Sequence, residues 1–266
     1  MKKLLIILLW CFVNLNAMSV DIQKDVIYNI ADSLVIKYKN HQWPNQEFVN
    51  SYIVRAFNIL DKKKYTDISK EWVDKQIALQ QQMKPKGMYY MGYHRKPGED
   101  SGDVFVADDA TIAMAILSTA LITKNAKQKD KYIDSVEEFV ELVLQKYRRK
   151  TGGITDGIWT KSKEEWWCST ALFSQLLYKL YSITHKTEYL IYANNAIDWL
   201  LEFEYYSSTT PKFTLKGGGA LTVMFYNLEA FSTAMIYTTG SRMELIQKKY
   251  SEYMLWLYYN LPRDLN

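Results

Sequence analysis

Cysteine and histidine are scarce in this chain of 266 residues, and neither occurs in a metal-binding pattern. The three histidines and two cysteines form no His-Glu-x-x-His motif and no paired Cys-x-x-Cys motifs, so we expect no bound metal ion. The glycines form no phosphate-binding loop between a strand and a helix, so we also expect no nucleotide cofactor. The sequence therefore predicts a protein that works without cofactors.

An excess of charge of one sign is also absent. The chain has 33 Lys and Arg residues against 29 Asp and Glu residues, for a formal net charge of +4. The basic residues are scattered along the chain, which is typical of a solvated surface. We therefore expect no nucleic-acid partner.

Long hydrophobic runs are missing beyond the first residues of the chain. The start combines Lys2 and Lys3 with an apolar stretch and reaches Ala17, a small residue suited to cleavage. This pattern predicts a secretory signal peptide over residues 1–17. We expect a secreted or periplasmic protein whose mature part, residues 18–266, is a single domain with no membrane span.

The cysteine at position 11 allows a second interpretation of the N-terminus. A cysteine after an apolar stretch can carry a lipid anchor, but Trp10 is bulky where lipobox sequences normally have a small residue. A signal peptide is therefore the preferred interpretation, and a lipoprotein anchored at Cys11 is the alternative. Removal of the signal peptide leaves Cys168 as the only thiol, so no intrachain disulfide is expected.

Helical periodicity dominates the rest of the chain. Short turns alternate with long connections that are rich in Gly and Tyr, so the pattern predicts one leading helix followed by four helical hairpins. The predicted helices cover residues 22–37, 46–62, 66–83, 109–123, 128–148, 165–183, 187–203, 220–238 and 242–260.

The hairpins repeat along the sequence. Tyr132, Tyr189 and Leu245 occupy equivalent positions near the start of three second helices, at spacings of 57 and 56 residues. Each first helix is apolar and rich in small residues, as in Ala110 to Leu121, so it is best buried between its neighbours with the more charged helix outside it. We predict an all-α fold, an incomplete α/α toroid in which the long loops gather on one face.

Two adjacent aspartates, Asp108 and Asp109, lie where one of these loops meets an inner helix. An aspartate at a helix start is often an N-cap, and Asp108 alone would fit that role. A pair can also supply the two carboxyl groups of a retaining glycosidase, which lie about 5–5.5 Å apart. The more solvated group would then act as the nucleophile and the more buried one as the acid.

Aromatic residues gather in the same set of loops. Sugars bind by stacking on aromatic rings and by hydrogen bonds to planar polar groups, so these loops suit a polysaccharide or oligosaccharide partner. The candidate substrate-binding residues are Tyr89, Tyr90, Tyr93, His94, Arg95, Trp159, Trp166, Trp167 and Tyr226.

Short motifs accompany the starts of the predicted inner helices. They are Ala107-Asp108-Asp109, Gly152-Gly153-Ile154 through Ile158-Trp159, and Tyr226-Asn227 before Thr238-Thr-Gly240. With these motifs, residues 105 to 250 resemble the six-hairpin glycosidase superfamily and, within it, are most similar to glycoside hydrolase family 76, the endo-α-1,6-mannanases. The resemblance implies a retaining glycosidase with Asp108 as the nucleophile and Asp109 as the acid/base.

Three alternatives stay open. The aspartate pair is also similar to that of unsaturated glycuronyl hydrolases, in which one Asp protonates an enol ether. A polysaccharide lyase could instead use Tyr93-His94-Arg95, with Tyr89 and Tyr90 nearby, as its proton-transferring and carboxylate-stabilising groups. A helical-hairpin array could also bind a glycan or a protein without cleaving it. The sequence does not indicate an oligomeric state.

Overall fold

The computed structural model describes residues 20–61, 63–93, 96–99, 105–155, 165–202 and 219–260. Within these ranges the chain forms nine α-helices and no β-strand, so the expected all-α class is confirmed. The helices are α2 (Val20–Lys39), α3 (Glu47–Leu60), α4 (Thr66–Gln80), α5 (Val106–Ile122), α6 (Ala126–Lys146), α7 (Trp167–Thr184), α8 (Thr187–Glu202), α9 (Gly219–Met235) and α10 (Gly240–Asn260).

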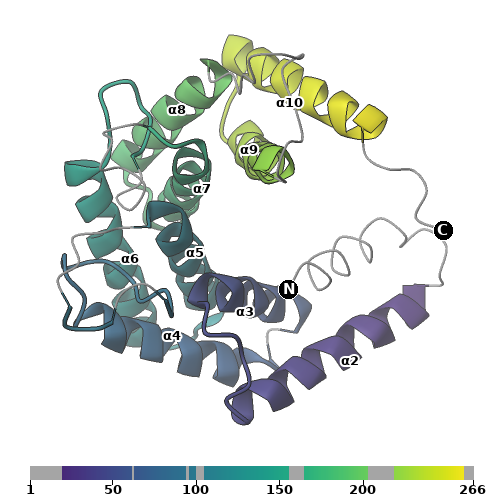
Figure 1. The fold of residues 1–266 in the computed structure, drawn as a ribbon, viewed down its shortest axis with the longest axis vertical. Helices are drawn as coiled ribbons and strands as arrows, with labels where there is room; N and C mark the ends of the chain where they lie inside the picture. The colour runs from purple at the N-terminus through teal and green to yellow at the C-terminus, as the bar shows by residue number, and fades with distance from the viewer. Residues whose placement is uncertain are drawn as a thin grey trace.

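The helices form an open ring of four hairpins preceded by α2 (Figure 1). Helices α3, α5, α7 and α9 are the inner helices, and each packs against the next one around the ring. Helices α4, α6, α8 and α10 lie outside them as the second members of the hairpins. The described helices leave the ring open between α2 and α10, so the predicted incomplete α/α toroid is confirmed.

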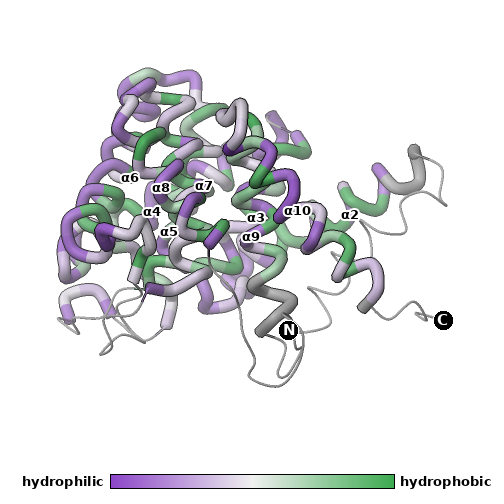
Figure 2. The backbone as a smooth tube through the Cα atoms, turned by 90° about the horizontal axis from the view of Figure 1, so that it is seen from above, coloured by the Kyte–Doolittle hydropathy of each residue, from purple (hydrophilic) through white to green (hydrophobic). Residues whose placement is uncertain are grey.

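Burial separates the inner helix from the outer one clearly in the hairpin formed by α5 and α6. In α5, 13 of 17 residues are buried, whereas in its hairpin partner α6 only 7 of 21 are buried. A helix that is apolar on all sides must be surrounded, while an amphipathic helix can cover it and face water. Figure 2 shows the result, with hydrophilic residues along outer helices such as α6 and hydrophobic residues on the helices beneath them.

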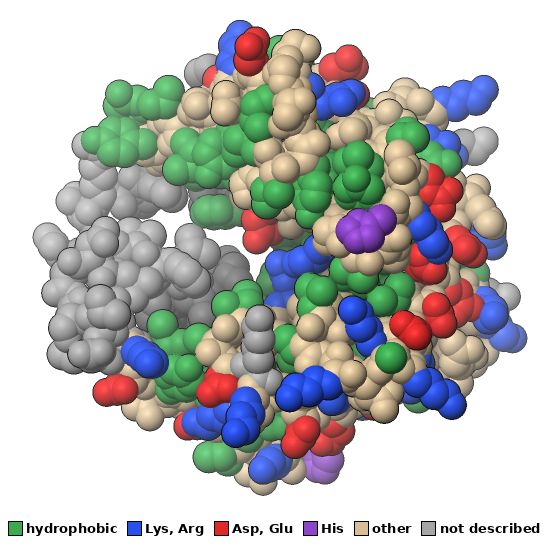
Figure 3. Space-filling model, turned by 180° about the vertical axis from the view of Figure 1, so that it is seen from behind, with side chains coloured by type: hydrophobic (Ala, Val, Ile, Leu, Met, Phe, Trp, Pro, Cys, Tyr) green, Lys and Arg blue, Asp and Glu red, His purple; other side chains and the backbone are tan. Residues whose placement is uncertain are grey.

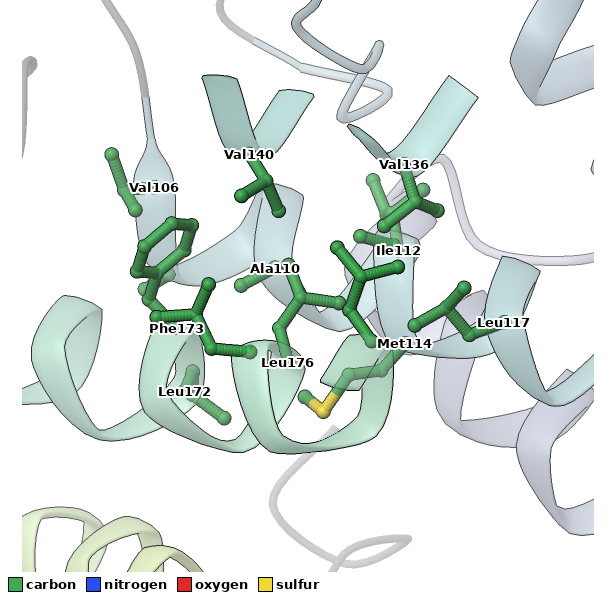
Figure 4. Packing of buried hydrophobic residues seen from close by; sticks show 14 of the residues in the cluster. Val106, Ala110, Ile112, Met114, Leu117, Val136, Val140, Leu172, Phe173 and Leu176 are labelled. Carbon is green, nitrogen blue, oxygen red and sulfur yellow. The ribbon is translucent and has the colours of Figure 1, made fainter. Parts of the chain in front are cut away.

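The hydrophobic core extends along the ring, and Figure 4 shows the part of it that lies between α5, α6 and α7. Alanines along α5 allow neighbouring helices to approach closely, and larger apolar side chains from both neighbours fill the space between them. Each large apolar side chain buried there contributes about 1.5–3 kcal/mol relative to exposure. The labelled members are Val106, Ala110, Ile112, Met114 and Leu117 from α5, Val136 and Val140 from α6, and Leu172, Phe173 and Leu176 from α7.

Connections of different length lie at the two ends of the ring. Within hairpins they are short, such as residues 123–125 and 185–186, and between hairpins they are long, such as residues 81–105 and 147–166. All inner helices therefore run in the same direction. We call the end formed by the N-termini of α3, α5, α7 and α9 the site rim, and the end formed by their C-termini the far end. None of the helices in the described ranges is both long and apolar enough to cross a lipid bilayer.

Candidate active site

The two aspartates lie in the first turn of α5. The helix begins at Val106, three residues earlier than predicted, and its N-cap is Phe105. The expectation that Asp108 could be the N-cap was therefore wrong, because its own backbone is already helical. Two carboxylates in the first turn still face the positive end of the helix dipole, which stabilises their negative charge.

The two neighbouring carboxyl groups occupy different environments. Asp108 is half-buried, and its Oδ2 accepts a hydrogen bond from the hydroxyl of Tyr93. Asp109 has no exposed surface. After burial, its negative charge also contributes to the raised pKa of Tyr89, which lies in the core. The helix thus directs one carboxyl group toward the aromatic side chains of the rim and the other toward the interior.

Aromatic neighbours and a close backbone contact hold Tyr93 in place. Its ring makes edge contacts with Phe48 at 6.2 Å and with Phe105 at 6.4 Å, measured between ring centroids. The preceding Gly92 has a φ of +87°, and a Cβ atom there would lie 2.8 Å from the backbone of Asn45. Because only glycine fits this contact, the loop can lie directly on the start of α3 and bring Tyr93 to Asp108.

Tyr89 is a core residue, contrary to the expectation that it would contact substrate. It has no exposed surface, and its hydroxyl donates to the backbone oxygen of Ser135 at 3.1 Å. Burial raises the pKa of Tyr89 above its ordinary value. Gln80 donates to the same oxygen at 3.0 Å, so this tyrosine helps to fix the loop onto α6. Tyr90 is half-buried and packs against the core.

A row of aromatic rings crosses the rim from α7 to α9. Trp166 and Trp167 have centroids 6.1 Å apart, and Trp167 stacks on Tyr226 at 6.2 Å with 27° between the planes. All three residues are partly exposed. Burial, and to a lesser extent the charge of Asp108, raises the pKa of Tyr226 to about 12. The aromatic row therefore ends close to the half-buried carboxylate.

The loop before α7 is anchored by an outer helix. Gly152 has a φ of +100°, and a Cβ atom there would overlap the backbone oxygen of Asn195 in α8. Glu165 accepts hydrogen bonds from Thr151 and, at 3.0 Å, from the indole of Trp199. These contacts fix the chain immediately before Trp166, where the aromatic row begins.

Three of the predicted site residues, His94, Arg95 and Trp159, lie outside the described residues. The structure adds Tyr52 on α3, which the sequence analysis missed. Tyr52 lies beside Tyr226, and burial is the main cause that raises the pKa of Tyr52 well above its ordinary value, with a smaller contribution from Tyr226. The only sequence signal for Tyr52 was a tyrosine on an inner helix, which is also typical of core packing.

The fold places the chain among the α/α toroid proteins, with carboxyl groups and aromatic rings on one rim. The family model described as glycosyl hydrolase family 76 matches residues 22–214, and the chain belongs to this family. The resemblance expected from the motifs around Asp108 and Asp109 is thereby confirmed. No curated protein matches the chain.

Proposed function

We propose that the protein is a secreted, retaining glycoside hydrolase that cleaves α-1,6-linked mannan-type polysaccharides or oligosaccharides. Membership of family 76 supports the reaction class. The observation that carries the site assignment is the half-buried carboxylate of Asp108, held by Tyr93 at the start of an inner helix and next to the aromatic row. Residues 18–266 would act as one domain after removal of residues 1–17.

Asp108 is the proposed nucleophile. The helix N-terminus and the hydrogen bond from Tyr93 both favour its ionised form. Its carboxylate would attack the anomeric carbon, form a glycosyl-enzyme ester and release the leaving sugar. Trp167 and Tyr226 would stack on sugar rings bound along the aromatic row.

Asp109 is the proposed acid and base. A carboxyl group withdrawn from water favours its neutral form, which is the form that can protonate the leaving oxygen. In the second step the same group would take a proton from water as the water attacks the ester. Because Asp109 has no exposed surface, the neighbouring side chains must shift when substrate binds so that the glycosidic oxygen reaches its carboxyl group.

Incubation of the purified protein with α-1,6-mannan tests the proposal. We expect new reducing ends, and proton NMR of the first product should show the α anomer before mutarotation. Asp108→Asn should remove this activity, while Asp130→Asn, at an exposed position on α6, should leave it unchanged. A β anomer as the first product would contradict the retaining mechanism, and products that carry an unsaturated uronate would indicate a lyase.

A further inference from the structure

Helices α3 and α9 carry the same pattern of residues on their inner faces. Each has a tyrosine followed three residues later by a charged residue, Tyr52 and Arg55 on α3 and Tyr226 and Glu229 on α9. Residues three apart lie on the same side of a helix. Since both helices start at the site rim, the tyrosines form an upper layer and the charged residues lie one turn closer to the far end.

A third charged residue joins this lower layer from α7. The charges of Arg55 and Glu229 both act on Lys179, which lies in the C-terminal half of that helix. The guanidinium carbon of Arg55 also lies over the ring of Tyr52, 5.4 Å from its centroid. Two cations and one carboxylate from three different inner helices therefore lie near enough to influence one another beneath the tyrosine pair.

The cations in this cluster have too little negative charge around them. Among the residues that the structure describes, neither Arg55 nor Lys179 forms an ion pair with a carboxylate, and Glu229 is exposed to solvent. The Nη1 atom of Arg55 is buried and has no hydrogen-bond partner. Burial, followed by the repulsion from Arg55, lowers the pKa of Lys179 to about 8. Such a cluster is unfavourable unless an anion joins it.

Space for an anion exists at the centre of the ring. Figure 3, seen from the side opposite to Figure 1, shows a hollow there with basic and acidic side chains at its edge. A guanidinium group and an ammonium group from two inner helices suit a phosphate, sulfate or carboxylate group, whose oxygens can accept several hydrogen bonds at once.

We propose that Arg55 and Lys179 form a binding site for an oxyanion at the centre of the ring, below the tyrosine pair and separate from the two aspartates. The shared chemistry is a phosphate, sulfate or carboxylate group, which can be a free ion or a substituent on a glycan chain. The site does not depend on the proposed hydrolase activity, because none of its residues takes part in the reaction at Asp108.

Calorimetric titration of the full chain with inorganic phosphate tests this site at constant ionic strength, with chloride as the reference. We expect saturable binding with a dissociation constant of about 1 mM or lower. Lys179→Met should weaken it at least tenfold, and Lys248→Met, which removes an exposed lysine from α10, should leave it unchanged. Asp108→Asn should retain full binding, so failure of the hydrolase proposal and failure of the anion site give different results.

A second set of titrations identifies the source of the anion. A phosphorylated oligomannoside is compared with its neutral counterpart in the wild type and in Lys179→Met. A preference for the charged sugar that Lys179→Met removes would assign the site to glycan recognition, and phosphate binding without such a preference would assign it to a free ion. Arg55→Lys should retain more affinity than Arg55→Met, because it keeps the charge.

Absence of saturable phosphate binding together with equal affinity for both sugars would overturn the site. Equal phosphate affinity in Lys179→Met and the wild type would also overturn it. Circular dichroism of each variant confirms that the helices are intact, so that a loss of binding is not a loss of fold.

Discussion

The site rim and the far end of the ring carry different chemistry on the same four inner helices. At the rim, side chains come from loops and first turns, and they combine two carboxyl groups with a row of aromatic rings. One turn closer to the far end, side chains come from the helices themselves, and the cluster of Arg55, Lys179 and Glu229 has two cations and one carboxylate. The difference shows how one helical frame can offer two types of surface: loops determine the first, and helical spacing determines the second.

The largest effect that separates the two ends should come from the aspartates. Asp108→Asn removes the proposed nucleophile and should lower kcat/KM by about 10³-fold or more on every substrate, which corresponds to about 4 kcal/mol. Asp109→Asn should cause a similar loss on mannan but a much smaller one on an aryl mannoside, whose leaving group needs no proton. Kinetics on both substrates measure this difference. Equal losses for Asp109→Asn on the two substrates would contradict its role as the acid.

A loop substitution should affect the rim through the backbone. Gly92→Ala adds a Cβ atom 2.8 Å from the backbone of Asn45 at a φ of +87°, so it should lower the free energy of unfolding by roughly 1–3 kcal/mol. Gly98→Ala is the matched control, because its φ is +89° and no atom lies within 4 Å of the added Cβ. Urea unfolding compares the two variants. An equal loss of stability in both variants would mean that the loss comes from backbone strain and not from the contact with Asn45.

A substitution toward the far end should increase stability. Because the pKa of Lys179 falls to about 8 from an ordinary value of 10.5, the folded state disfavours its charged form. This unfavourable contribution is complete below pH 8 and disappears as the pH rises to about 10.5. Lys179→Met should therefore stabilise the protein by about 1–2 kcal/mol at pH 7 and by less at pH 10.

Thermal unfolding at the two pH values measures this gain. Lys248→Met should show no change, since Lys248 is exposed on α10. A loss of stability in Lys179→Met at pH 7 would show that this lysine contributes to the core through its aliphatic chain and that the charge cluster is not under strain.

The smallest effect should come from the aromatic row. Trp167→Ala removes a ring that stacks on Tyr226 and should raise KM about tenfold on long mannans, with little change in kcat, because stacking contributes equally to the ground state and the transition state. Trp256→Phe, a change on α10 that keeps a ring against the core, is the control. A fall in kcat without a change in KM would place Trp167 at the reacting sugar.

Much of the fold could be predicted from the sequence, because hydrophobic periodicity and turn residues mark the ends of helices. All nine predicted helices are present, and the inner and outer members were distinguished by their small and charged residues. The start of α5 was placed too late because Val106 and Ala107 follow an irregular aromatic segment and no polar N-cap precedes them. A helix capped by phenylalanine gives no signal of the usual type.

The site was less predictable than the fold. Asp108 and Asp109 could be selected because they are adjacent in the sequence, and the same holds for Trp166 and Trp167 at the start of α7. Tyr89 was assigned to the wrong environment, since a tyrosine in a polar loop can also turn inward to meet Ser135. The proximity of Tyr52 to Tyr226 and of Arg55 to Lys179 depends on how the helices assemble into the ring, which local patterns do not encode.

The proximity of Tyr52 to Tyr226 across the ring also has a consequence for the order of folding. Most contacts in the ring join neighbouring hairpins, which can form early because little chain must be closed. Tyr52 and Tyr226 lie on the first and last inner helices of the ring, so their contact must wait until every hairpin has assembled. In a refolding experiment, helical content should therefore recover first, and the proposed enzymatic activity should return only with the final closure of the ring.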